Sequence, residues 1–98
     1  MTPSPSEQQP HRWGAYFITA TAACRAAALW RCSIAEAAFR LDAEMRAAPE
    51  HGPGEYGSTL YRLPGGEFAA VKPPPWHVGA GGKRAVVWVG PADYTPPA

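Results

Sequence analysis

The stretch STLYRLPGGEFAAVK, residues 58–72, decides the fold because it predicts a β-hairpin. Its flanks, 58–63 and 67–72, are rich in aromatic and apolar residues, and Pro-Gly-Gly at 64–66 is a strong turn signal. A further strand is expected at 84–89, where an apolar run is typical of a strand that is covered on both faces. Together these segments predict a three-stranded antiparallel sheet in which each strand pairs with the next one along the chain.

The register of this hairpin depends on the length of its turn. A two-residue turn formed by the two glycines would place Leu63 beside Phe68 and Tyr61 beside Ala70 on one face. A three-residue loop would shift the pairing by one position. The sequence by itself leaves both arrangements open.

Upstream of the hairpin, residues 13–48 have the composition of helices, with thirteen alanines, one glycine and no proline. We expect one helix over about 13–31 and a second over about 34–48, each with apolar residues at spacings of three and four. Ser33 and Glu36 form a capping-box pattern, in which the serine hydroxyl accepts a hydrogen bond from the Glu36 amide. This pattern favours a bend before the second helix, and one continuous helix is the alternative.

The predicted fold class is therefore α+β, with two N-terminal helices packed on a three-stranded antiparallel sheet in the order ααβββ. A chain of 98 residues is long enough for one modest core, so we assign 13–91 to a single small domain. Residues 1–12 hold three prolines and are expected to form a disordered N-terminal arm. Residues 92–98 are expected to form a flexible C-terminal tail.

Charge and cysteine usage narrow the class of protein. Nine Lys and Arg against eight Asp and Glu give a net charge of +1, which argues against a protein that coats DNA and against a wholly disordered chain. The uncharged stretch 13–24 is shorter than the roughly 20 residues needed to span a bilayer, so no membrane association is expected. If Cys24 and Cys32 share a helix, they lie about 12 Å apart, which is too far for a disulfide. Two unbridged thiols fit a cytoplasmic protein.

The sequence contains no recognisable catalytic or metal-binding motif. Its three histidines, His11, His51 and His77, are not at metal-ligand spacing from one another or from the cysteines. A nucleophile elbow is missing around Ser58, and the Gly-Lys at 82–83 lacks the earlier glycine of a phosphate-binding loop. We therefore expect a protein that is not an enzyme and that uses no metal and no cofactor.

One cluster of residues has the composition of a binding surface. Antiparallel pairing would bring Lys72, at the end of one strand, beside Lys83 and Arg84, at the start of the next. The loop that joins these strands carries Trp76 and His77. Rigid aromatic residues beside cations are typical of surfaces that bind proteins or single-stranded nucleic acid. The structural alternative is that Trp76 folds back over the sheet as a lid, while the cations keep the edge soluble.

These observations favour a non-enzymatic protein-binding regulator or inhibitor. Small, nearly neutral chains without catalytic motifs are common among stand-alone bacterial and phage proteins such as antitoxins, anti-CRISPR proteins and anti-restriction proteins. The alternative is a nucleic-acid-binding module that uses the edge formed by Lys72, Trp76, Lys83 and Arg84. A secondary candidate surface lies on the first helix, at Arg25 and Arg31. A protein partner is expected, and the oligomeric state stays open, with a dimer among the options.

Overall fold

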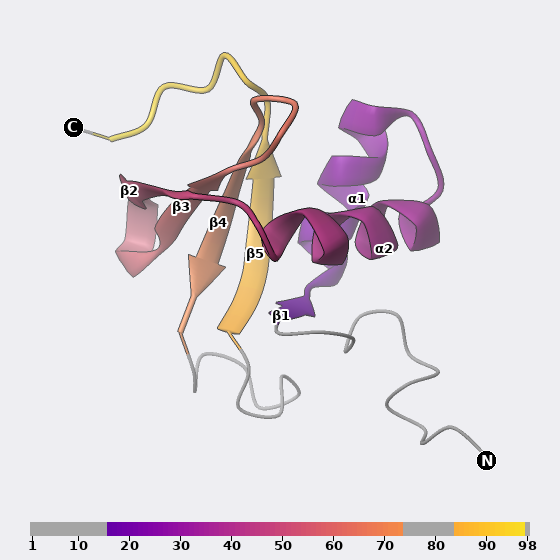
Figure 1. Cartoon of the computed structure of the whole chain (residues 1–98), viewed down its shortest axis with the longest axis horizontal. Helices are drawn as coiled ribbons and strands as arrows, with labels where there is room; N and C mark the ends of the chain where they lie inside the picture. The colour runs from indigo at the N-terminus through magenta and orange to yellow at the C-terminus, as the bar shows by residue number, and fades with distance from the viewer. Residues whose placement is uncertain (1–15, 74–83, 98) are drawn as a thin grey trace.

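The computed structural model describes residues 16–73 and 84–97. In chain order its elements are β1 (Tyr16–Ile18), α1 (Ala20–Trp30), α2 (Ile34–Met45), β2 (Glu50–Pro53), the 3-10 turn η3 (Glu55–Gly57), β3 (Thr59–Arg62), β4 (Phe68–Lys72) and β5 (Arg84–Gly90). The strands form one sheet in the order β1-β5-β4-β3-β2, in which β1 runs parallel to β5 and the other neighbours are antiparallel (Figure 1). The predicted α+β domain with two helices is confirmed. The predicted three-stranded antiparallel sheet is wrong, because the sheet has five strands and is mixed.

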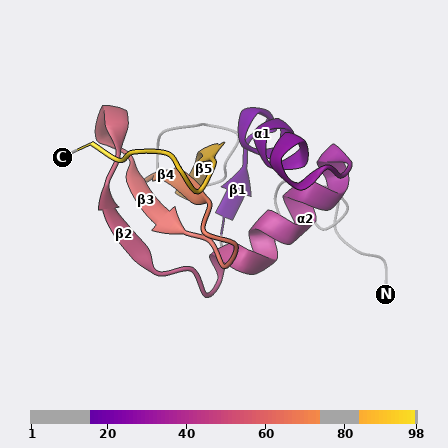
Figure 2. The same ribbon diagram turned by 90° about the horizontal axis from the view of Figure 1, so that it is seen from above.

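Both helices pack on the same face of the sheet, where they form the main core (Figure 2). Six alanines of these helices are buried: Ala22, Ala23, Ala26, Ala27, Ala37 and Ala38. Such small side chains let the helices approach each other and the sheet closely. Larger side chains fill the remaining space, among them Ile18, Leu41, Met45, Val86 and Val89.

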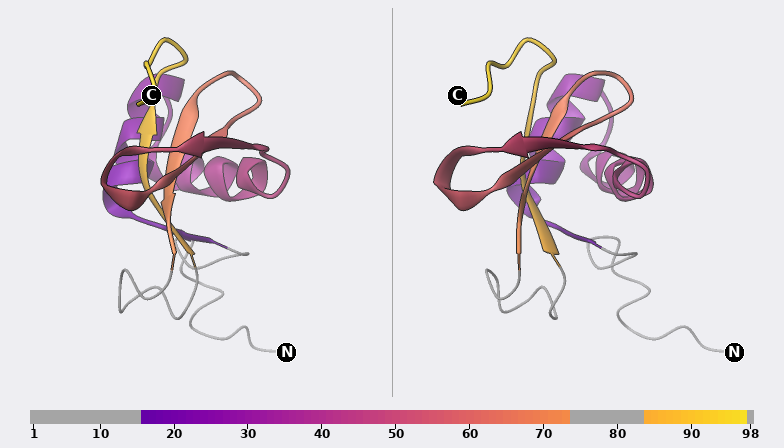
Figure 3. Two further views of the ribbon diagram at one scale, coloured as in Figure 1. Left: turned by 90° about the vertical axis from the view of Figure 1, so that its left-hand side faces the viewer. Right: turned by 60° about the vertical axis from the view of Figure 1, so that its left-hand side comes forward.

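The other face of the sheet is covered by neither of the two described α-helices and holds a second, smaller cluster. Its buried members are Leu60, Phe68 and Ala70, and three partly buried residues pack against them: Val87, Trp88 and Tyr94. The sheet twists strongly, so β2 crosses β4 and β5 at a steep angle (Figure 3). We call this side of the sheet the open face.

Residues 16–18 of the expected first helix instead form the strand β1, while 1–15, which include the predicted N-terminal arm, lie outside the described residues. Tyr16, Phe17 and Ile18 are aromatic or β-branched, which favours a strand over a helix. β1 pairs in parallel with the first three residues of β5, with Ile18 opposite Val86. Thr19 then caps α1, because its hydroxyl accepts a hydrogen bond from the Ala22 amide at 3.2 Å.

The strand β2 was not predicted either. It follows the second helix, in a stretch where the sequence analysis expected no regular structure. Helix α2 ends at Met45 rather than near residue 48, and β2 forms the outer strand beside β3. It contains Gly52 and Pro53, residues that are rare inside sheets. Proline is tolerated at a sheet edge because no further strand needs its missing amide hydrogen.

The predicted bend between the helices is confirmed. Arg31 ends α1 in the left-handed conformation, with φ 56° and ψ 51°, and its amide donates to the carbonyl of Ala27. Ser33 begins the next helix, and its hydroxyl oxygen accepts from the Glu36 amide at 3.1 Å. Within the part of the chain that the structure describes, no helix is long and apolar enough to cross a bilayer.

The hairpin takes the register of the three-residue loop, one of the two arrangements that the sequence left open. Leu60 lies opposite Ala70, Tyr61 opposite Ala69, and Arg62 opposite Phe68. The cause is the turn: the Gly66 amide donates to the carbonyl of Leu63 at 2.8 Å, and Gly66 has a φ of +94°, which glycine adopts without strain. This register places Tyr61 on the helix side of the sheet and Phe68 on the open face.

Candidate functional site

The antiparallel pairing of β4 and β5 brings Lys72 and Arg84 to the same end of the sheet, as the sequence analysis expected. Lys72 lies opposite Ala85, the direct neighbour of Arg84. The other three members of the predicted edge, Trp76, His77 and Lys83, lie outside the described residues. The described part of this candidate surface therefore consists of two cations.

Arg84 lies on the helix side, where two tyrosines hold its guanidinium. It donates to the hydroxyl oxygens of Tyr16 and Tyr61, each at 2.9 Å, and lies over both rings. Burial raises the pKa of the Tyr16 hydroxyl, although the nearby Arg84 charge acts in the opposite direction. Arg84 thus stabilises the junction between β1, β3 and β5.

Lys72 lies on the open face. Its ammonium donates to the backbone carbonyl of Tyr56, and its side chain lines a cavity together with Val87 and Trp88. The two described cations therefore lie on opposite faces of the sheet, and each is bound to a tyrosine oxygen. They do not form one continuous cationic strip.

The secondary candidates, Arg25 and Arg31, have different environments. Arg25 donates from Nε to the carbonyl of Val89 at 2.7 Å and stacks over the Trp88 ring at 4.8 Å. It therefore covers the half of β5 that β1 does not pair with. Arg31 is exposed and closes the end of α1. Arg25 is thus part of the packing between helix and sheet.

An open groove of about 490 Å³ lies at the junction of α1 and α2, and we call it the helical groove. Its lining residues are Trp30, Cys32, Ala35, Glu36, Phe39 and Arg40. Phe39 is 57% exposed, and Leu29 and Ile34, on the same two helices, are 39% and 48% exposed. Three of the four large hydrophobic residues with exposed side chains in the described chain therefore belong to the helical layer.

A connected set of contacts fixes one wall of the helical groove. The Trp30 indole donates to a Glu67 carboxylate oxygen at 2.9 Å, which ties α1 to the hairpin loop. Arg40 lies over the Trp30 ring at 3.9 Å and pairs with Glu44 at 2.6 Å. This pairing with Glu44 raises the pKa of Arg40, so the guanidinium stays charged. A rigid tryptophan beside an arginine is typical of residues that dominate binding energy at interfaces.

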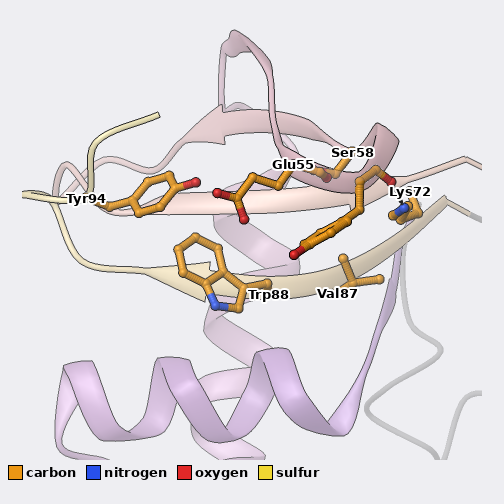
Figure 4. Close-up of a pocket in the computed structure, with 7 residues that line it drawn as sticks. Glu55, Ser58, Lys72, Val87, Trp88 and Tyr94 are labelled. Atoms are coloured by element: carbon orange, nitrogen blue, oxygen red, sulfur yellow. Dashed lines mark hydrogen bonds between the residues drawn. The ribbon is translucent and has the colours of Figure 1, made fainter. Parts of the chain in front are cut away.

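A second hollow of about 270 Å³ lies on the open face, and we call it the open-face cavity. It is lined by Glu55, Tyr56, Ser58, Lys72, Val87, Trp88 and Tyr94 (Figure 4). The Tyr94 ring lies 4.8 Å from the Trp88 ring and 5.8 Å from the Phe68 ring, centroid to centroid. Tyr56 is 88% exposed and has a left-handed backbone, with φ 55°.

The sequence analysis predicted neither the helical groove nor the open-face cavity, although the sequence contains some indication of each. Phe39 is displaced from the buried positions Ala38, Leu41 and Met45 of α2, and a large aromatic residue off the buried face of a helix points to a surface contact. The open-face cavity is harder to predict from the sequence because its lining residues come from four separate stretches of chain. Only the fold brings them together.

No cluster of three or more His, Cys, Asp or Glu suited to a metal ion occurs among the described residues. Cys24 and Cys32 are free thiols. The structure defines a small α+β domain with two candidate sites, the helical groove on one side of its sheet and the open-face cavity on the other. Comparison of the chain with protein-family models, with curated proteins and with solved structures finds no match.

Proposed function

We propose that this chain is a non-enzymatic regulator or inhibitor that binds a protein partner through the helical groove. The observation that carries the proposal is the groove walled by Trp30, Phe39 and Arg40, which lies on the two helices that also carry the exposed Leu29 and Ile34. Tryptophan and arginine are enriched among residues that dominate protein interfaces, and an exposed apolar patch on a small domain is typical of an interaction site.

The class of stand-alone bacterial and phage regulators, such as antitoxins, anti-CRISPR proteins and anti-restriction proteins, fits this size and this charge. Such a protein acts by occupying a surface of its partner and needs no chemistry of its own. A net charge of +1 supplies little long-range attraction to a polyanion, which also favours a protein partner.

Nucleic-acid binding through Lys72, Trp76, Lys83 and Arg84 is the second proposal, and it has less support. Its two described cations lie on opposite faces of the sheet and are already bound to tyrosine oxygens. A site that tracks a phosphate backbone needs its cations along one continuous surface.

The test is capture of partners from a lysate by three immobilised proteins, followed by affinity measurement on the purified partner. The baits are the wild-type chain, Phe39→Ala, and Tyr56→Ala as a matched loss of an exposed aromatic residue on the other face. We expect a stoichiometric partner that the wild type and Tyr56→Ala retain and that Phe39→Ala loses. The affinity loss should be about 2 kcal/mol, or roughly 30-fold.

Two results would contradict this function. A partner that depends on Tyr56 and not on Phe39 would move the site to the open face. A short oligonucleotide that binds with a steep salt dependence, while no protein depends on Phe39, would favour the nucleic-acid proposal. Thermal unfolding of each bait controls for folding, and Phe39→Ala should change stability by about 1 kcal/mol or less because the ring is mostly exposed.

A further inference from the structure

We propose that the open-face cavity is a binding site for an organic cation, that is, an alkylammonium or guanidinium group. The proposal does not rest on the helical groove, because the two hollows lie on opposite sides of the sheet and share no lining residue. It rests on three aromatic rings and one carboxylate that meet around a cavity of about 270 Å³.

The cavity offers a cation more than one aromatic surface, and one of these rings, Trp88, already has the Arg25 guanidinium over it at 4.8 Å. Trp88 and Tyr94 lie at 61° to each other, so together they form a corner rather than a flat stack. Tyr56 supplies a third ring at the rim. Aromatic faces attract cations, and several rings around one cavity are the usual way in which proteins recognise quaternary ammonium groups.

Glu55 supplies the negative charge that such a site needs. Its carboxylate points into the cavity toward the Tyr94 hydroxyl (Figure 4). Within the described chain the recorded ion pairs are Arg40–Glu44 and Arg46–Asp42, so Glu55 belongs to neither. Glu55 is exposed, and its charge attracts a cationic ligand to the rings while offering no such attraction to a neutral one.

Lys72 also brings a positive charge to the lining, at the end of the cavity away from Tyr94, and its ammonium is held at the rim (Figure 4). It donates to the carbonyl of Tyr56, while the Ser58 hydroxyl donates to the carbonyl of Glu55 at 2.7 Å. These two bonds hold the rim in a conformation in which Tyr56 is left-handed, an arrangement that is costly for a residue other than glycine. Lys72 and Ser58 thus shape the rim, and Glu55 carries the charge that selects the ligand.

The test is a titration followed by NMR through the indole N–H signal of Trp88. Choline is the cationic probe, and 3,3-dimethylbutanol, which has the same shape without the charge, is its matched control. N-acetyl-arginine amide represents a basic side chain offered by a protein. We expect saturable shifts of Trp88 with at least one cation, and at least fivefold weaker binding of the neutral probe.

Two charge variants complete the experiment. Glu55→Gln should weaken binding of the cation about tenfold, whereas Glu50→Gln, at an exposed position outside the cavity, should change it less than twofold. Tighter binding of choline than of the arginine amide would identify the ligand as a small quaternary ammonium compound, and the reverse order would identify it as a basic side chain. Equal binding of the neutral probe, an unchanged affinity in Glu55→Gln, or no Trp88 shift with either cation would overturn the proposal.

Discussion

At the scale of single residues, Gly90 controls the position of Trp88. A Cβ atom added at Gly90 would lie 2.0–2.8 Å from three atoms of the Trp88 ring, so the indole rests directly on the glycine. We expect Gly90→Ala to displace the indole and to lower the free energy of unfolding by about 1–3 kcal/mol. Urea denaturation measures the loss, and near-ultraviolet circular dichroism reports the disturbed packing of Trp88 against Tyr94.

The matched control is the same change in a Trp88→Leu background, where the smaller side chain leaves room for the added methyl group. If Gly90→Ala costs as much in that background as in the wild type, the packing of Trp88 over Gly90 is wrong.

Tyr16 makes stability depend on pH in the alkaline range. Burial holds the pKa of its hydroxyl above the ordinary value of 10.0, so the folded state keeps the proton when the unfolded chain would lose it. The contribution to stability is therefore complete below about pH 10 and is lost as the pH rises through the higher pKa of the folded state. We expect the free energy of unfolding to fall between about pH 8 and pH 11 more in the wild type than in Tyr16→Phe.

Chemical denaturation at the two pH values measures this difference. Tyr56→Phe controls for the loss of a tyrosine hydroxyl at an exposed position. An identical pH dependence in the wild type and in Tyr16→Phe would contradict the assignment to Tyr16.

At the scale of the elements, Thr19 joins β1, α1 and β5. Its hydroxyl accepts from the Ala22 amide at 3.2 Å and donates to the carbonyl of Val86 at 2.9 Å. We expect Thr19→Ala to lower the free energy of unfolding by about 2 kcal/mol, because it removes a cap and a hydrogen bond between distant elements. Ser33→Ala removes a cap alone and should cost about 1 kcal/mol.

Thr19→Ser keeps the hydroxyl and should restore most of the stability lost in Thr19→Ala. Urea denaturation of the three variants beside the wild type measures these differences. Equal losses in Thr19→Ala and Ser33→Ala would show that the bond to Val86 contributes nothing.

The elements that the sequence predicts are those whose signals are local. Ser33 marks the start of α2 by its own side chain, and the turn glycines mark the hairpin that begins β4. The strand β1 could not be predicted because three residues are too few to distinguish a strand from the first turn of a helix. What makes them a strand is pairing with β5, which begins far along the chain at Arg84. The register of the hairpin depends on the conformation of Gly66, which composition does not reveal.

The candidate sites, too, could be predicted only where the signal is local in the sequence. Antiparallel pairing predicted that Lys72 and Arg84 lie at one end of the sheet, but not that they point to opposite faces, because the face depends on the register and on the irregularity between Ala70 and Val71. The open-face cavity depends on the path of the chain after β5, which brings Tyr94 back onto Trp88.

At the scale of the whole molecule, the sheet separates a large hydrophobic cluster on the helix side from a small one on the open face. The helices cover one face with a continuous core, whereas the open face depends on a small cluster and on the segment that follows β5. Tyr94 contributes ring contacts to both Phe68 and Trp88, although 92–98 has the composition of a flexible tail. Tyr94 is therefore part of the cluster on the open face.

Truncation tests this role of the C-terminal segment. A chain that ends at Gly90 loses Tyr94 and exposes the Phe68–Trp88 cluster to water, so we expect its free energy of unfolding to fall by about 2–4 kcal/mol. A chain that ends at Thr95 keeps Tyr94 and should match the full chain within about 0.5 kcal/mol. Denaturation by urea compares the three lengths, and Tyr94→Ala in the full chain should reproduce most of the loss. Equal stability of the chains that end at Gly90 and at Thr95 would show that the helical layer alone stabilises the domain.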